Sequence, residues 1–154
     1  MKKNNLLITV FLLCLITMVQ SCKNPDGQSS NPFLQEYDTP HGTAPFHLIK
    51  AEHYEPAMLA GMAAEEKEIE AIVNNSEAPT FANTIVPYAN SGDLLGKVLN
   101  VFYNLMEAET NDTLQQIAEK MSPLLTEHSN NISLNPELFN RVKTVYENQQ
   151  DDQR

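Results

Sequence analysis

The side chains in this sequence best suited to catalysis or metal binding are four histidines: His41, His47, His53 and His128. None of them is followed by a glutamate, so the zinc-binding pattern H-E-x-x-H is absent from the sequence. His47 and His53 are six positions apart, and on a regular helix this spacing points two side chains in directions about 120° apart. From these residues alone we predict no catalytic site and no metal site, and we interpret His128 as a hydrogen-bonded histidine at the edge of a core.

Acidic residues concentrate in one short run that contains Glu65, Glu66, Glu68 and Glu70. Calcium sites take carboxylates from a loop that wraps around the ion, whereas this run lies within a helical pattern. We therefore interpret the run as the solvated face of an amphipathic helix.

Cys22 is the candidate for covalent modification. Lys2 and Lys3 form a positive start, and residues 6–18 carry no charge, a length typical of a signal peptide and short for a membrane-spanning helix. The residues that follow, Val19-Gln20-Ser21-Cys22, resemble the bacterial lipobox, in which the cysteine is diacylated and becomes the new N-terminus. We expect a signal peptide over 1–21, lipidation of Cys22 and a lipid-anchored protein of the bacterial cell envelope that faces the periplasm. The alternative is ordinary signal cleavage, with Cys22 unmodified.

The charge balance excludes one class of partner. The sequence has 20 acidic and 10 basic residues and a net charge of −10, and loss of Lys2 and Lys3 with the signal makes it −12. Nucleic-acid binding depends on clustered lysine and arginine, and no such cluster is present. We expect no nucleic-acid partner.

The structural elements that position the four histidines and the acidic run begin after a linker that tethers them to the signal peptide region. Residues 22–32 are rich in turn-forming residues and read as a linker, and residues 33–49 read as an extended lead-in whose aromatic side chains dock on a larger body. Residues 50–148 show helical periodicity, and 149–154 form a polar tail that we interpret as a truncation.

Apolar spacing and capping residues predict an all-α fold of four or five helices. The first starts near residue 51, with Pro56 in its first turn, and Thr80 caps a short second one that Pro87 kinks. Asn111 or Asp112 caps the fourth helix, and Asn135 caps the last. The apolar stripes that define the helices are Met58, Leu59, Met62, Ile69, Ile72 and Val73; Leu94, Leu95, Val98, Leu99, Phe102 and Leu105; Leu114, Ile117, Ala118, Met121, Leu124, Leu125 and His128; and Leu138, Phe139, Val142, Val145 and Tyr146.

Several strings in residues 31–148 resemble, in order and spacing, the N-terminal region of one zinc metallopeptidase family, that of thimet oligopeptidase, oligopeptidase A and peptidyl-dipeptidase Dcp. The chain departs from the pattern at Ala82, where an acidic residue is usual, and at Val86-Pro87, where a helix continues in the family. The strings are Asn31-Pro32-Phe33, Glu52-His53-Tyr54-Glu55-Pro56-Ala57, Ala78-Pro79-Thr80-Phe81, Asn83-Thr84-Ile85, Ser91-Gly92, Leu94-Leu95, Val101-Phe102, Asn104-Leu105, Ser122-Pro123-Leu124-Leu125, Asn135 and Leu138-Phe139.

The resemblance implies a helical, two-lobed enzyme that cleaves short peptides with zinc held by an H-E-x-x-H helix and a further glutamate. None of those ligands can be placed on this sequence. The resemblance therefore implies that this chain is an N-terminal fragment that supplies helices of the channel wall, binds no zinc and is inactive alone.

A second hypothesis is a free-standing helical lipoprotein that acts as a binding or remnant module. The two differ in their surfaces, because a fragment exposes apolar faces meant for missing helices, whereas a free-standing module has polar outer faces. A third possibility is that the short chain is itself a zinc peptidase, and we expect it to be excluded by zinc analysis.

Overall fold

The computed structural model describes residues 31–151, with side chains to 148, so the expected signal peptide and Cys22 lie outside the described residues. The main elements are α2 (Ala51–Val73), α3 (Val86–Ala89), α4 (Asp93–Ala108), α5 (Asp112–Ser133) and α6 (Pro136–Asp151). Short 3₁₀ turns occupy Pro32–Leu34 and Pro40–Gly42, and one turn of π-helix occupies Phe81–Ile85. Residues 31–151 contain no strand, which confirms the all-α prediction. Within that range, no helix combines the length and the apolar character needed to cross a bilayer.

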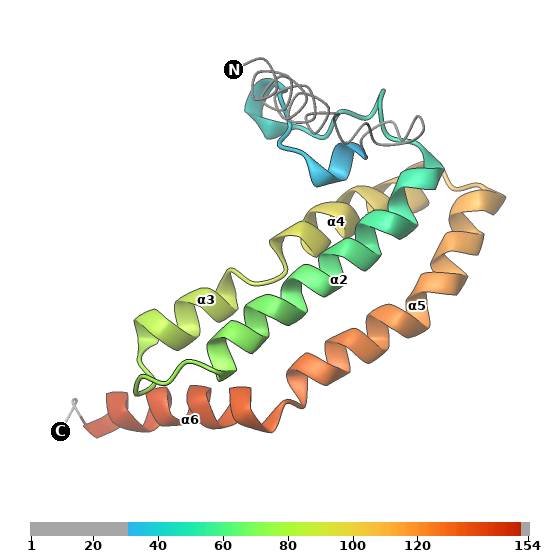
Figure 1. Cartoon of the computed structure of the whole chain (residues 1–154). Coiled ribbons are helices and arrows are strands. Elements are labelled where there is room, and N and C mark those ends of the chain that lie inside the picture. Colours follow the sequence, from blue (N-terminus) through green and yellow to red (C-terminus); the bar gives the residue numbers. More distant parts are fainter. Residues whose placement is uncertain (1–30, 152–154) are drawn as a thin grey trace, which may run out of the picture.

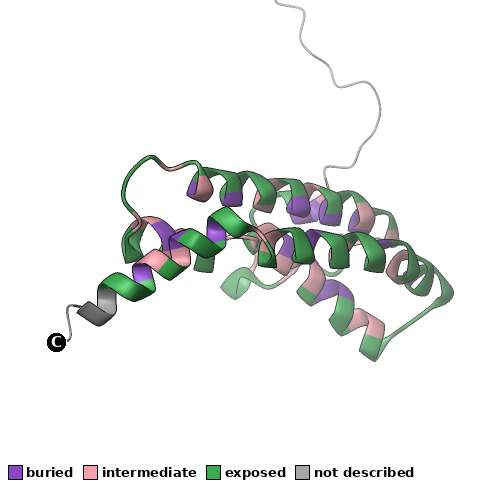
Figure 2. Ribbon diagram, turned by 90° about the horizontal axis from the view of Figure 1, so that it is seen from below, coloured by how far each residue is buried: buried purple, intermediate pink, exposed green. Residues whose placement is uncertain are grey.

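The long helix α2 is the centre of the molecule. The helices α4 and α5 pack along it from two sides, and α6 crosses its C-terminal end (Figure 1). Buried residues form narrow stripes on helices whose other faces are exposed (Figure 2). Each helix thus buries one stripe against α2 or its neighbours, as amphipathic periodicity predicts.

The main core cluster joins the lead-in to α2, α4 and α5. Phe33 is fully buried, and its ring lies 5.2 Å from that of Tyr54, which in turn lies 5.1 Å from that of Phe102. Tilted and edge-to-face pairs at these separations add to the stabilisation from buried area. Met58, Met62, Leu95, Val98, Leu114 and Met121 complete the cluster with Ala57 and Val101.

A smaller cluster fixes the far end of α2 to α6. Ile69, Ile72 and Leu138 are buried there, with Val73, Ile132 and Val142 packed against them. Arg141 of α6 is 9% exposed and donates to the carbonyl oxygens of Asn75, at 2.8 Å, and Glu77, at 3.4 Å. These carbonyls follow the C-terminus of α2, where the helix dipole favours a positive charge.

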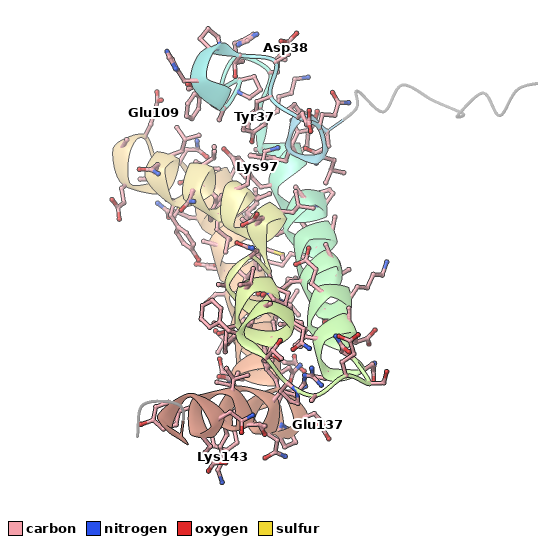
Figure 3. All side chains as sticks on the ribbon, turned by 90° about the vertical axis from the view of Figure 1, so that its left-hand side faces the viewer. Tyr37, Asp38, Lys97, Glu109, Glu137 and Lys143 are labelled. Atoms are coloured by element: carbon pink, nitrogen blue, oxygen red, sulfur yellow. The ribbon has the colours of Figure 1, made fainter. Side chains whose placement is uncertain are left out.

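The lead-in is only partly the docked strip that the sequence predicts. Asn31 Nδ2 donates to the His53 carbonyl at 2.8 Å, and Lys97 Nζ donates to the carbonyls of Phe33 and Gln35 at 3.1 and 2.7 Å. The same ammonium lies 3.7 Å from the centre of the Tyr37 ring, and Figure 3 labels both residues. Phe33 is therefore held in the core, whereas Phe46 and Leu48, further along, are about half exposed.

The predicted caps are confirmed at three helix starts. The Asn111 side chain accepts from the Leu114 N–H at 3.0 Å, and the Asn135 side chain accepts from the Leu138 N–H at 2.9 Å. The hydroxyl of Thr80 accepts from the Asn83 N–H at 3.1 Å. Each bond satisfies one of the backbone donors that a helix start leaves unpaired.

The placement of Pro56 in a first turn is wrong. Helix α2 begins at Ala51, so Pro56 lies inside the helix and cannot donate to the carbonyl of Glu52. The helix starts early because Lys50 is extended and its N–H donates to His53 Nδ1 at 3.1 Å, which caps the turn before the proline.

Candidate functional site

The structure keeps the four histidines apart. His41 and His47 are exposed in the lead-in, whereas His53 and His128 are buried in α2 and α5. Within the described part of the chain, no group of three or more His, Cys, Asp or Glu side chains is arranged to hold a metal ion. These residues do not fit the zinc site of the resembled family, and Cys22 lies outside the described residues.

His53 has a structural role at the start of α2. Its Nδ1 accepts the Lys50 N–H, so the ring proton resides on Nε2, which lies 3.9 Å from a carboxylate oxygen of Glu52. The ring is 5% exposed. Capping and burial together account for this histidine.

His128 forms the most distinctive polar contact of the helical body. Its Nε2 lies 2.8 Å from Glu65 Oε2, and its Nδ1 lies 3.7 Å from Glu66 Oε1. The histidine side chain is 6% exposed and that of Glu65 is 17% exposed, so the pair links α5 to α2 in a largely water-excluded position. Because a carboxylate only accepts hydrogen bonds, Nε2 carries a proton.

Glu65 also departs from the predicted solvated face. Glu66, Glu68 and Glu70 are exposed, as expected for that face, but Glu65 turns towards α5 and the loop before α4. A Cβ atom placed on Gly92 would lie 2.7 Å from the Glu65 carboxylate, and Gly92 has φ +75°. The Gly92 N–H donates to Glu68 Oε2 at 2.9 Å. The positive φ favours glycine at this position, which brings the start of α4 onto two glutamates of α2.

A groove runs between α4 and α5 next to α3, and Glu65 and His128 are among the residues that line it. One hollow of about 620 Å³ and a neighbouring one of about 280 Å³ share Leu125 and Ser129. We call their combined surface the α4–α5 groove. Its lining residues are Glu65, Ile85, Tyr88, Ala89, Ser91, Leu95, Leu99, Tyr103, Ser122, Leu125, Thr126, His128, Ser129, Asn130, Ile132 and Ser133.

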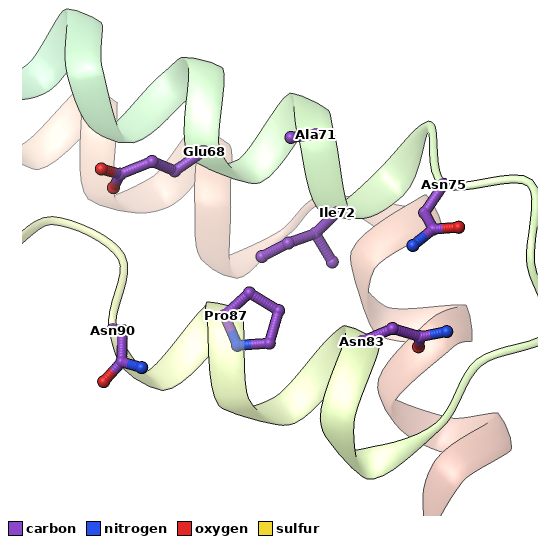
Figure 4. Close-up of a pocket in the computed structure, with 7 residues that line it drawn as sticks. All are labelled: Glu68, Ala71, Ile72, Asn75, Asn83, Pro87 and Asn90. Atoms are coloured by element: carbon purple, nitrogen blue, oxygen red, sulfur yellow. The ribbon is translucent and has the colours of Figure 1, made fainter.

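A second hollow of about 450 Å³ lies between the end of α2 and α3 (Figure 4). Ile72 and Pro87 face each other across it, and Asn75, Asn83 and Asn90 surround them. Asn83 and Asn75 are engaged elsewhere, because Asn83 Oδ1 accepts the Thr80 N–H and the Asn75 carbonyl accepts from Arg141. Glu68 also lines the hollow, and its Oε2 accepts the Gly92 N–H at 2.9 Å, so the polar groups named here serve the helix junction.

The sequence matches known peptidases. Dipeptidyl carboxypeptidase of Salmonella typhimurium is 43% identical over 119 residues, which make up 77% of this chain and 18% of that protein. The Escherichia coli dipeptidyl carboxypeptidase is also 43% identical, over 117 residues (76% of this chain and 17% of that protein). The chain is homologous to the thimet oligopeptidase family. Oligopeptidase A of Salmonella typhimurium is 28% identical over 116 residues, or 75% of this chain and 16% of that protein.

No protein-family model matches the chain. The chain spans less than a fifth of the length of these curated relatives. The match extends over about three quarters of this sequence.

The relation between His128 and Glu65 is the feature that sequence reasoning missed. The two residues are 63 positions apart, and neither lies in a motif. One signal was present, since both belong to helices whose apolar stripes face a common core.

Proposed function

We propose that this chain supplies N-terminal channel-wall helices of an exported, peptidyl-dipeptidase-like zinc metallopeptidase that cleaves short peptides. The 43% identity to two dipeptidyl carboxypeptidases carries the proposal. The chain spans only 18% and 17% of those two relatives, and this supports a role as one part of a larger enzyme.

In this proposal the zinc ligands lie on polypeptide beyond this sequence. The sequence has no H-E-x-x-H, and its two buried histidines serve as a helix cap and as the partner of Glu65. When bound, zinc would supply an activated water for peptide hydrolysis. The residues described above contribute rigid helices, and a purified preparation of this chain is expected to contain no stoichiometric zinc.

The surface of the helical body favours this proposal over a free-standing binding module. Large apolar side chains that are at least two-fifths exposed occur on α2, α4 and α6, among them Leu59, Tyr103 and Phe139, and Leu134 in the α5–α6 junction is 78% exposed. The fragment hypothesis expects exposed apolar side chains of this kind, because faces meant for further helices stay uncovered.

Export and anchoring complete the proposal. A diacylglyceryl group on the Cys22 sulfur would hold the protein on the membrane, because each buried methylene adds about 0.8 kcal/mol. Radiolabelled palmitate is expected to label the full chain in a bacterial host and to leave Cys22→Ser unlabelled. Labelling of the Cys22→Ser variant would exclude this cysteine as the anchor.

A chimera tests the enzymatic part. The 117 matched residues of Escherichia coli dipeptidyl carboxypeptidase are exchanged for the matching residues of this chain, and release of dipeptides from a short peptide is measured. The control is the same enzyme with the stretch deleted. We expect the chimera to be active and the deletion variant to be inactive. A chimera no more active than the deletion variant contradicts the proposal.

The size of the native product tests the alternative of a free-standing lipoprotein. An antibody against residues 50–148 is used to blot membranes of the source cells. A band several times larger than the 17.3 kDa of this chain is expected, whereas a band at that mass favours the free-standing module.

A further inference from the structure

The α4–α5 groove combines apolar walls with side chains that allow close approach. Leu95 and Leu99 line it from α4, and Leu125 and Ile132 line it from α5. Between them lie the small side chains Ser91, Ser122, Ser129 and Ser133. Helices pack with their axes 8–10 Å apart, and small residues on the facing surface permit the closer separations.

Glu65 is the residue of α2 that lines the groove, and the packing of the helices on α2 fixes the position of the groove. Both α4 and α5 pack on α2, and the Glu65–His128 pair holds α5 at a set distance from it. The two hollows follow one another along α5 from Ser122 to Ser133, which suits an elongated occupant such as a further helix better than a compact ligand.

The negative charge in the groove restricts which helices can bind there. Glu65 is the carboxylate in its lining, and the residues that line it include no lysine or arginine. The whole chain carries a net charge of −10. A second copy of the chain would bring the same negative charge, whereas a helix with a lysine or arginine beside its apolar face would complement the groove.

We propose that the α4–α5 groove receives an amphipathic helix, apolar on one face and carrying a basic residue opposite Glu65, from the polypeptide that completes the peptidase. This inference rests on the proposed function. The length of the relatives supports it, because more than four-fifths of the Salmonella typhimurium enzyme lies outside the matched stretch. The helix would turn the α2–α4–α5 layer into a closed bundle in which Leu99 and Leu125 are buried on both sides.

Chemical labelling of introduced cysteines tests the groove directly. Ser129→Cys places a thiol in the groove, and Ser76→Cys places one on the exposed turn after α2 as the matched control. Each is made in this full chain, with Cys22 replaced by serine, and in the Escherichia coli chimera. Maleimide labelling of each position is followed by mass spectrometry of the tryptic peptides.

In the chain alone, both cysteines are expected to label at similar rates. In the chimera, Ser129→Cys is expected to label at least about tenfold more slowly, because reaction then requires opening of a packed interface, while Ser76→Cys keeps its rate. Equal rates for Ser129→Cys in the chain and in the chimera overturn the proposal. Equal slowing at both positions overturns it too, because the protection is then not specific to the groove.

Further labelling measurements on the same variants identify what occupies the groove. Protection of Ser129→Cys in the chain alone that grows with protein concentration would assign the groove to a second copy and overturn the proposal. If the chimera does not fold, the chain is mixed with the Escherichia coli enzyme lacking its matched stretch, and absence of protection in that mixture overturns it. An inactive chimera with Ser129→Cys protected would contradict the proposed function and leave the groove assignment standing.

Discussion

The hydroxyl of Tyr54 lies at the centre of the main core without a hydrogen-bond partner among the described residues. The ring is 2% exposed and packs between Phe33 and Phe102. A buried hydroxyl without a partner costs stability, because it loses its hydrogen bonds to water. The Tyr54 ring thus stabilises the core through packing, whereas its unpartnered hydroxyl lowers the free energy of unfolding.

Tyr54→Phe is therefore expected to raise the free energy of unfolding by about 1 kcal/mol at neutral pH, measured in urea. Tyr103→Phe, in an exposed tyrosine of α4, is the control with no expected change. A loss of stability in Tyr54→Phe would show that the hydroxyl has a bound partner.

The same residue predicts a pH dependence. Burial raises the pKa of the Tyr54 hydroxyl, and the charge of Tyr37 raises it further. The folded state therefore holds this proton more tightly than the unfolded state does. The stability that comes from this difference is fully present below the unfolded pKa of about 10. It is lost as the pH rises from there through the raised pKa of the folded state. Tyr54→Phe is expected to flatten the decline of stability above about pH 10. An unchanged alkaline slope in the variant would contradict this assignment.

Glu65 and Glu66 are neighbours in sequence with different environments. Glu65→Ala removes the 2.8 Å contact to buried His128 and is expected to cost about 1.5–3 kcal/mol. Glu66→Ala changes a side chain that is 61% exposed and is expected to cost less than about 0.5 kcal/mol. Equal costs in urea unfolding would show that the His128 contact does not distinguish the two residues.

At the scale of elements, two glycines test how α2 and α4 meet. A Cβ atom on Gly61 would lie 2.8 Å from the Cα of Leu95, whereas one on Gly96 would meet nothing within 4 Å. Gly61→Ala forces two helix backbones apart and is expected to cost about 1–3 kcal/mol. Gly96→Ala is expected to stabilise the protein by about 0.5–1 kcal/mol, because alanine is the better helix former. Thermal unfolding of both variants measures the contrast, and a shared sign would refute the close approach.

Helix starts were predictable wherever the signal is local. Asn111, Asn135 and Thr80 cap the helices that the sequence assigns to them, since a cap depends only on the next three residues. Pro56 was misplaced because the competing cap, the side chain of His53, is not one of the usual capping residues. The π turn at Phe81–Ile85 likewise has no sequence signature of its own.

The site was less predictable than the fold, because its contacts join residues that are distant in the sequence. His128 was recognised as a hydrogen-bonded histidine at the edge of a core, but its partner could not be named, because the pair depends on how α5 lies on α2. The apolar stripe of α6 was predicted as one face, whereas Leu138 and Val145 are buried and Phe139 is 63% exposed. Periodicity identifies a stripe, and tertiary packing decides how much of it is covered.

At the scale of the whole molecule, the two core clusters differ in size. The smaller one holds α6 through three buried residues and Arg141, and the larger one joins the lead-in, α2, α4 and α5. Regions with fewer buried contacts open at lower free energy. We expect native-state hydrogen exchange to show α6 amides exchanging faster than those of α2 and α4.

Arg141→Met sharpens this expectation, because it removes the bonds from α6 to the carbonyls of Asn75 and Glu77. Exchange in α6 is expected to accelerate while α4 is unaffected. Lys143→Met, on an exposed position of the same helix, is the control. Uniform acceleration across all helices would show instead that the two clusters unfold as one unit.

The docking of Phe33 also sets an order of events during synthesis. Asn31 bonds to a residue 22 positions later, and the carbonyl of Phe33 bonds to Lys97, 64 positions later. A chain that emerges from its N-terminus must therefore wait for α4 before the lead-in can close over the core, because contacts distant in sequence form last. Until α4 has been made, the face of the Tyr54 ring that Phe33 covers stays open to water, so the nascent chain presents an apolar surface for that interval.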